Sequence, residues 1–323
     1  MPGPAILASM HPSFRCLFLS AAALAAFQTA AAQTTVLRND DLSSMSGWFN
    51  SSNSGISVVN GGLSVSAGRH ALTYFAPTPQ TLASGESLQV TFDLSFTTVG
   101  TTSGGFRVGL FDSNGATRPT ANGVSDAFQN YDGYAFTWTP NPGSGSNSLN
   151  LRKRLTDGTN QLLSSITDGT NYSVFNSGNS SSSGSASGQV FQTGTVYAAT
   201  YSINRGSGNA LTIDFNVTGG GAGWNFGKSY SITGPNDLAF DAFAILSVSN
   251  TAPSSGSNFA IDNLRITHTA AAPSNSGSGV SAFDLGGPTV IPEPSTYAAC
   301  AGAAVLGLAF WRRRRAAAQG GSS

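Results

Sequence analysis

The feature that most restricts the fold of this chain is a strict alternation of apolar and polar side chains in short runs. In the run 88–96, Leu88, Val90, Phe92 and Leu94 occupy alternate positions, and polar residues stand between them. A period of two is typical of a half-buried antiparallel strand, whose successive side chains point to opposite faces. The pattern therefore predicts strands with one face in a core.

Similar runs recur through the middle of the chain, with turn signals roughly every 8–15 residues. Asn60-Gly61 separates two of them and favours a tight type I′ hairpin. No amphipathic pattern long enough for a three-turn helix occurs in 34–268. The strand candidates are 56–59, 62–66, 71–75, 88–96, 105–111, 133–138, 149–155, 190–203, 210–217, 239–248 and 259–266. About eleven to thirteen such strands predict an all-β fold of two packed antiparallel sheets.

Three segments resemble the concanavalin-like jelly-roll group, which includes lectins and laminin-G-like modules. They are Trp48 with Gly62-Leu63, the central Phe-Arg-Val-Gly-Leu-Phe-Asp at 106–112, and the closing Phe-Ala-Ile-Asp-Asn-Leu at 259–264. The resemblance implies a two-sheet antiparallel jelly-roll sandwich, concanavalin- or laminin-G-like, over 34–268. A fold of this kind does not fix a function.

The first 32 residues have the pattern of an export signal. Arg15 precedes a short apolar run at 16–19, and alanine-rich sequence follows. Residues 30–33, Ala-Ala-Ala-Gln, place small side chains where signal peptidase requires them. We therefore expect a signal peptide at 1–32, removed by signal peptidase, and export of the rest.

The other end of the chain carries a candidate membrane helix. Residues 296–311 are apolar and would span about 24 Å as a helix, slightly less than a bilayer core of about 30 Å. The cluster that follows consists of Arg312, Arg313, Arg314 and Arg315. Because positive charge is retained in the cytoplasm, this cluster predicts that everything before the helix lies outside.

The motif before that helix is Pro292, Glu293, Pro294 and Ser295. With the helix and the arginines, it resembles the PEP-CTERM sorting signal over 290–315. The resemblance implies recognition by an exosortase, removal of the helix, and a host that produces exopolysaccharide. It also implies location at the cell envelope, outer surface or extracellular matrix after transient anchoring in the inner membrane. The alternative is a single-pass anchor that is never cut.

Residues 269–289 are rich in Ala, Pro, Ser and Gly and predict a flexible linker between the sandwich and the sorting signal. Residues 33–290 contain ten basic and fourteen acidic side chains. This balance does not provide the cationic face that nucleic-acid binding needs. Both cysteines, Cys16 and Cys300, lie in the terminal segments, so the sandwich has no disulfide or thiolate site.

The acidic and histidine residues argue against catalysis. Glu86 is the one glutamate of the sandwich, and glycosidases of this fold usually use paired carboxylates. The two histidines of the sandwich, His70 and His268, stand at predicted strand ends and are expected to be exposed. We therefore expect no enzyme, although carboxylates on separate strands would leave a hydrolase or lyase open.

Aromatic and amide groups provide candidates for binding carbohydrate, because sugar faces stack on rings. The richest segment is 130–138, with Tyr131, Asp132, Tyr134 and Trp138, and a second candidate is Trp224 after the glycine-rich loop 219–223. The stripe that Tyr134 and Trp138 share is either a ligand face or part of the core. The sequence leaves both open.

A structural calcium ion is a further expectation, since oxygen ligands near the first and last strands suit it. The candidate ligands are Asp41, beside Asp40, and Asp262. The alternative is that they are turn and edge residues. No other cofactor is expected.

Three function classes follow. The first is a non-catalytic exported surface or matrix protein associated with exopolysaccharide and biofilm. The second is a carbohydrate-binding or adhesion module with a defined glycan ligand. The third, less favoured, is a glycoside hydrolase or lyase.

Overall fold

A computed structural model describes the sandwich in segments. These are residues 31–50, 54–99, 105–116, 118–123, 128, 130–140, 149–155, 162–163, 171–175, 180–183, 189–234, 236–248 and 257–273. Within them no helix is long and apolar enough to cross a membrane. The predicted signal peptide up to residue 30, most of the linker, the helix 296–311 and the sorting motif lie outside the described residues.

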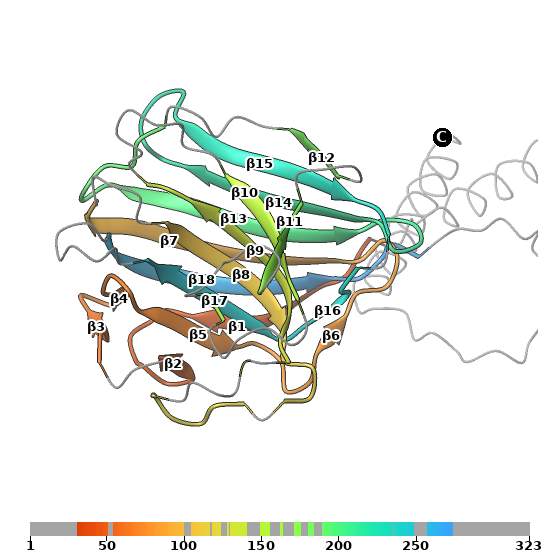
Figure 1. The fold of residues 1–323 in the computed structure, drawn as a ribbon, viewed down its shortest axis with the longest axis horizontal. Coiled ribbons are helices and arrows are strands. Elements are labelled where there is room, and N and C mark those ends of the chain that lie inside the picture. Colours follow the sequence, from red (N-terminus) through yellow and green to blue (C-terminus); the bar gives the residue numbers. More distant parts are fainter. Residues whose placement is uncertain are drawn as a thin grey trace, which may run out of the picture. The chain divides into compact units, whose positions relative to one another are not determined.

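The described residues form two large antiparallel sheets (Figure 1). The nine-stranded sheet runs in the order β12 (Ser180–Ser183), β15 (Asn225–Ile232), β14 (Leu211–Thr218), β13 (Val196–Arg205), β7 (Ser87–Thr98), β18 (Asn258–Thr269), β4 (Gly62–Val65) and β3 (Ile56–Val59), and β1 (Thr34–Asp40) also pairs with β18. The seven-stranded sheet runs β11 (Tyr172–Val174), β10 (Asn150–Arg154), β9 (Asp132–Trp138), β8 (Phe106–Asp112), β17 (Ala242–Ser247), β5 (His70–Tyr74) and β2 (Trp48–Asn50). The short strands β6 (Gln80–Thr81) and β16 (Ala239–Phe240) pair separately.

The main core lies between the two large sheets and follows from the alternation. In β7, Leu88, Val90, Phe92 and Leu94 are all buried, and the residues between them are half-buried or exposed. The facing strand β9 contributes aromatic side chains to the same core. The all-β, two-sheet antiparallel sandwich predicted from the sequence is therefore confirmed.

The hairpin between β3 and β4 has the predicted geometry. Val59 pairs with Gly62, which leaves Asn60 and Gly61 as a two-residue loop. Both loop residues have positive φ, 53° and 84°, as a type I′ turn requires.

Six strands were absent from the sequence prediction: β1, β2, β6, β11, β12 and β15. In β15, position 228 is a lysine that pairs with the buried Phe215, so a charge interrupts the apolar alternation. The Lys228 ammonium lies 5.2 Å from the ring centroid of Tyr230, where a cation–π contact accommodates it. Because a lysine occupies an inward-facing position, the apolar alternation of β15 could not be recognised in the sequence.

The last strand, β18, lies inside the nine-stranded sheet, between β7 on one side and β4 and β1 on the other. Its final residue pairs with the first residue of β1, Thr34 with Thr269. The Ala270 amide continues this contact by donating to the Gln33 carbonyl at 2.8 Å. The first and last strands therefore leave the sandwich side by side.

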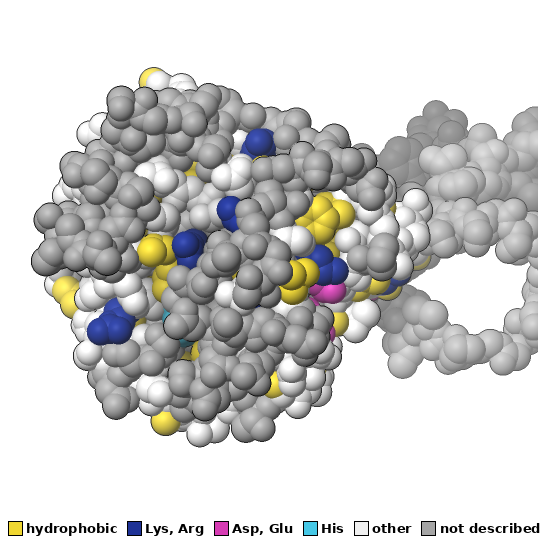
Figure 2. All heavy atoms as spheres, in the orientation of Figure 1, with side chains coloured by type: hydrophobic (Ala, Val, Ile, Leu, Met, Phe, Trp, Pro, Cys, Tyr) yellow, Lys and Arg dark blue, Asp and Glu magenta, His cyan; other side chains and the backbone are white. Residues whose placement is uncertain are grey.

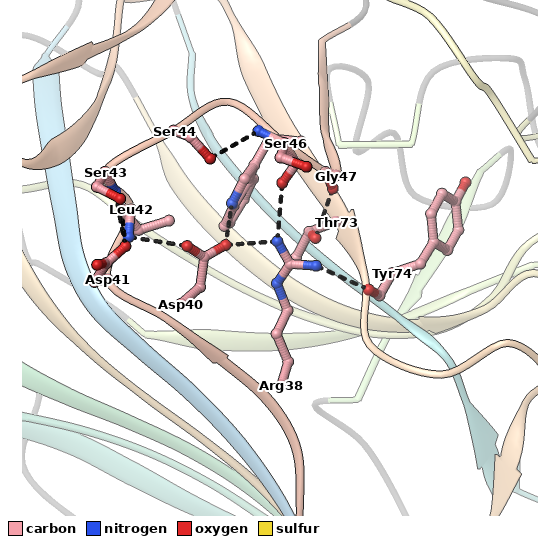
Figure 3. A network of polar contacts seen from close by, with 11 residues as sticks. Arg38, Asp40, Asp41, Leu42, Ser43, Ser44, Ser46, Gly47, Thr73 and Tyr74 are labelled. Atoms are coloured by element: carbon pink, nitrogen blue, oxygen red, sulfur yellow. Dashed lines mark hydrogen bonds and ion pairs between the residues drawn. The ribbon is translucent and has the colours of Figure 1, made fainter.

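An ion-pair network ties β1 to the other sheet (Figure 3). One Asp40 oxygen accepts from the Arg38 guanidinium at 2.5 Å and from the Trp48 indole N–H at 2.9 Å. Arg38 also donates to the Tyr74 carbonyl of β5 at 3.3 Å. Since Trp48 belongs to β2, the network links both sheets at one corner.

A second apolar cluster covers the outer face of the seven-stranded sheet. It includes Leu72, Phe111, Phe128, Tyr131 and Leu163, all buried. The cluster therefore shields this part of the outer face from solvent.

His70 lies beneath this cluster, and its side chain is only 2% exposed. The prediction from the sequence that His70 is exposed was wrong. Its ring contacts Phe128 edge-on, with centroids 5.8 Å apart. Neither ring nitrogen has a hydrogen-bond partner in the described part of the chain. Burial lowers the pKa of His70 from its ordinary 6.5 to about 4, because the charged imidazolium is desolvated.

Replacing Asp40 by alanine is expected to lower the free energy of unfolding by about 2 kcal/mol, since the buried Trp48 N–H and the Arg38 guanidinium lose their acceptor. Asp41→Ala is the matched control, because Asp41 is exposed and its hydrogen bonds to another described residue come from Ser43. Chemical denaturation of the full chain measures both. Equal losses in the two variants would contradict a role for the network.

His70 is expected to make the fold sensitive to acid. Its folded-state pKa lies below the unfolded value, so the unfolded state binds the extra proton and stability falls as the pH drops from 6.5 to 4. The loss reaches about 3 kcal/mol by pH 4. His70→Leu should flatten this decline in thermal unfolding across that range, whereas His268→Gln should retain it. An unchanged pH profile in His70→Leu would refute the assignment.

Candidate functional site

A hollow of about 390 Å³ opens on the outer face of the nine-stranded sheet. Its polar lining includes Asn60, Ser64, Asp93, Ser95 and Asp262, which come from the β3–β4 turn, β4, β7 and β18. We call it the outer-face hollow.

Strand register explains why the surface is hollow there. Ser64 pairs with Ala260, and Ala260 pairs with Ser95, so small side chains stand side by side on three strands. The larger Val59 and Val196, 51% and 61% exposed, stand among the lining residues. Small residues thus form the floor, and exposed valines form apolar walls.

A β-bulge shapes the acidic side of the hollow. Asp262 pairs with Asp93 and Arg265 with Thr91, so β18 takes one more residue than β7 over this stretch. Asn263 has φ 52°, the left-handed conformation that asparagine tolerates better than most residues. The extra residue keeps Leu264 in the core while changing the direction of Asn263.

Asn263 holds both carboxylates. Its side-chain amide donates to Asp93 Oδ2 at 2.8 Å, and its backbone N–H donates to Asp262 Oδ1 at 2.7 Å. The second oxygen of each carboxylate has no protein partner among the described residues. Two acceptor oxygens therefore remain available to a ligand.

The facing carboxylates carry a physical cost. Like charges directly opposite one another on adjacent strands repel, and both side chains are half-buried. Arg265 is the nearest cation by register, one same-face step along β18, and it forms no ion pair with either aspartate within the described structure. A ligand that donates hydrogen bonds or carries positive charge would relieve the repulsion.

The structure assigns the aromatic stripe of β9 to the core and not to a ligand face. Tyr134 and Trp138 are 0% and 2% exposed, and the Trp138 ring lies 4.5 Å from that of Phe106. Tyr131 is also buried, with its hydroxyl 2.5 Å from the hydroxyl of Tyr74. These rings cannot stack on a sugar in this conformation, which corrects their candidacy.

Asp132, the fourth residue of that group, is half-buried at the start of β9. Its carboxylate accepts from the Asn114 side chain at 3.4 Å, beside the turn that follows β8. It lies on a different sheet from the hollow.

Trp224 is only partly exposed and packs against the protein. Its ring centroid lies 4.7 Å from that of Tyr197 and 5.1 Å from that of Phe191. A Cβ added to Gly220 would lie 2.5 Å from the indole, so the ring also rests on this glycine. The indole covers the edge of the core, which leaves it poorly placed as a sugar platform.

Asp41 and Asp262 were predicted to be ligands of one structural calcium ion. Asp41 is exposed, and one of its oxygens accepts both the N–H and the hydroxyl of Ser43. Hydrogen bonds from this serine lower the pKa of Asp41. Among the described residues no group of three or more His, Cys, Asp or Glu side chains is placed to hold a metal ion. Asp41 and Asp262 are thus not part of such a group among the described residues, and a calcium ion held by them stays a prediction.

Asp262 was predicted as a site residue, whereas its partner Asp93 and the neighbouring Asn60 and Asn263 were not. Asp93 had one available signal, since it is the one charged residue on the polar side of 88–96. Its pairing with Asp262 depends on the order of strands in the sheet, which one sequence does not give.

Basic side chains are scattered over the face of the molecule that Figure 2 shows. In the view of Figure 2, the visible Lys and Arg side chains lie apart from one another and form no single patch.

Comparison with known proteins identifies one segment. Residues 290–315 match the PEP-CTERM protein-sorting motif, the motif expected from the sequence. This motif marks an exported protein that is sorted to the cell envelope, and it implies processing by an exosortase. No curated protein matches the sequence.

Solved structures resemble the sandwich at low sequence identity. They include the CBM2 module of an evolved Dit protein of Lactobacillus casei BL23 phage J-1, at 9% identity, covering 73% of this chain and 96% of the module, with a TM-score of 0.43. The metal-free carbohydrate recognition domain of Emp46p has 13% identity, coverages of 72% and 94%, and a TM-score of 0.43. A PL-14 alginate lyase from Aplysia kurodai has 12% identity, coverages of 72% and 98%, and a TM-score of 0.41. Similarity at this level says nothing about what this chain binds.

Proposed function

We propose that this chain is a non-catalytic surface or matrix protein that an exosortase cleaves at its C-terminal tail. The match of 290–315 to the sorting motif carries this proposal. Signal peptidase would remove 1–32, and the apolar segment 296–311 with its four arginines would hold the chain in the inner membrane until cleavage. The sandwich would then be free to join the exopolysaccharide matrix.

The strand order supports a role for the linker 269–289 in this process. Because β18 is a central strand, the nine-stranded sheet cannot close until residue 269 has left the membrane. The twenty residues 270–289 that follow β18 reach about 65 Å when extended. The linker is therefore long enough for the sandwich to fold while the tail is still anchored.

Hydrogen bonding in the sandwich supports a non-catalytic role. Hydrogen bonds from the Ala83 N–H and from His268 lower the pKa of Glu86, which makes it a poor general acid at neutral pH. Asp93 and Asp262 do face each other, and one oxygen of each accepts a hydrogen bond from Asn263. Among the described residues, the other oxygen of each is free to accept from a bound ligand.

A second function is favoured by the outer-face hollow: contact with a glycan. Its volume lies within the range of small-ligand sites, and it combines apolar walls with a few convergent polar groups. The floor residue Ala260 stands nine positions before Thr269, about 30 Å along β18 by strand rise. The hollow is thus remote from the point where the linker begins.

Tail processing can be tested by mass spectrometry of the protein released from its native cells. The mature form should lack 296–311 and the four arginines. Glu293→Ala combined with Pro294→Ala should leave the tail in place, while Pro288→Ala, just outside the motif, should not. A released protein that still contains Trp311 would overturn the cleavage.

Glycan contact can be tested by retention of the full chain on exopolysaccharide from the same cells. Ala260→Tyr should abolish retention, because the ring fills the hollow. Thr212→Tyr places the same ring on the outer face of β14 and should have no effect. Equal retention by both variants would contradict a binding role for the hollow, and shortening of the polysaccharide by the protein would contradict a non-catalytic role.

A further inference from the structure

We propose that the outer-face hollow selects sugar units that carry a free amine, as in a de-N-acetylated amino-sugar polymer. The inference rests on the glycan contact proposed above and specifies its ligand. It follows from the charge, geometry and wall chemistry of the hollow together.

The charge of the lining is the first argument. Among the described residues that line the hollow, Asp93 and Asp262 are the charged ones, and none is a lysine or an arginine. Sugars that bear carboxylate, sulfate or phosphate would face two negative charges without a compensating cation. Acidic polysaccharides are therefore poor ligands for this site.

The position of the two carboxylates is the second argument. They stand directly opposite each other on β18 and β7, and Asn263 fixes one oxygen of each. An ammonium group has three donors and no acceptor, so it can bridge the remaining oxygen of each aspartate. Charge-assisted hydrogen bonds of this kind are stronger than those from a neutral hydroxyl.

The rest of the hollow suits a sugar ring around that amine. The Asn60 amide and the Ser64 and Ser95 hydroxyls can donate to and accept from ring hydroxyls. Exposed Val59 and Val196 offer apolar contact for C–H groups. An isolated metal ion or small amine would use the carboxylates but leave these groups unused.

Arg265 lies close enough to the hollow for its charge to affect the binding of a charged ligand. It is exposed on the same face of β18, opposite Thr91, about 7 Å from the level of Asp93 by strand rise. Its positive charge would repel a cationic ligand. Removing it should therefore strengthen binding of an amine-bearing sugar and leave a neutral sugar unaffected.

The experiment is isothermal titration of the full chain in detergent at pH 6 with four oligosaccharides of equal length. These are a glucosamine oligomer, its N-acetylated counterpart, a neutral glucose oligomer and an oligouronate. The glucosamine oligomer should bind at least tenfold more tightly than the others, and its affinity should fall as salt rises.

Four variants locate the effect. Asp93→Asn and Asp262→Asn should each weaken glucosamine binding about tenfold, because each removes one charge-assisted hydrogen bond. Asp214→Asn changes a carboxylate on the same sheet face, bonded to Ser202 and outside the hollow, and should have no effect. Arg265→Gln should tighten glucosamine binding a fewfold while leaving the glucose oligomer unchanged.

The possible results distinguish the preference for an amine from the more general proposal that the hollow binds a glycan. Equal binding of all three non-acidic oligomers, lost in Ala260→Tyr, would overturn the amine preference and leave the glycan contact standing. Binding of the glucosamine oligomer that Asp93→Asn and Asp262→Asn do not weaken would also overturn it. No binding by any oligomer, and none to the exopolysaccharide, would overturn both.

Discussion

The central position of the final strand is the constraint on which the rest of the structure depends. β18 pairs with β7 over most of its length and with β1 and β4 on its other edge. Its inward side chains, such as Phe259 and Ile266, complete the core. A sheet whose middle strand comes last can form only after the whole sandwich sequence is present. The nine-stranded sheet is therefore complete only once the residues up to Thr269 are free to pair.

The same strand also builds the hollow. An added residue at Asn263 shifts register without exposing Leu264, so the core alternation survives on both sides of the bulge. On the outer face, the bulge places Asn263 where its backbone and side-chain amides bond the two opposed carboxylates, beside the small residues that form the floor of the hollow. A bulge that only relieved twist would not need an aspartate on each strand. The arrangement is better explained by something bound outside the sheet.

The sequence was a good guide to the fold and a poor guide to the site, for physical reasons. Alternation marked β7 and β14 because burial on one face imposes it, and Asn60-Gly61 marked a turn because both residues need positive φ. Strand order leaves no such local trace, so Asp93 and Asp262 appeared unrelated. Aromatic residues misled the site prediction, since rings such as Trp138 pack a core as readily as they stack on sugars.

Cleavage and binding depend on each other in this view. Removal of 296–311 would leave the sandwich without a membrane anchor, so its retention would require contact with something outside the cell. Only 9% of the residues of the chain are charged, so its surface offers little non-specific electrostatic attraction. A localised pair of carboxylates on that sparsely charged surface can then discriminate among polymers by charge, because few other charges compete with it. Weak single sites of this kind retain a protein when the polymer repeats its ligand many times.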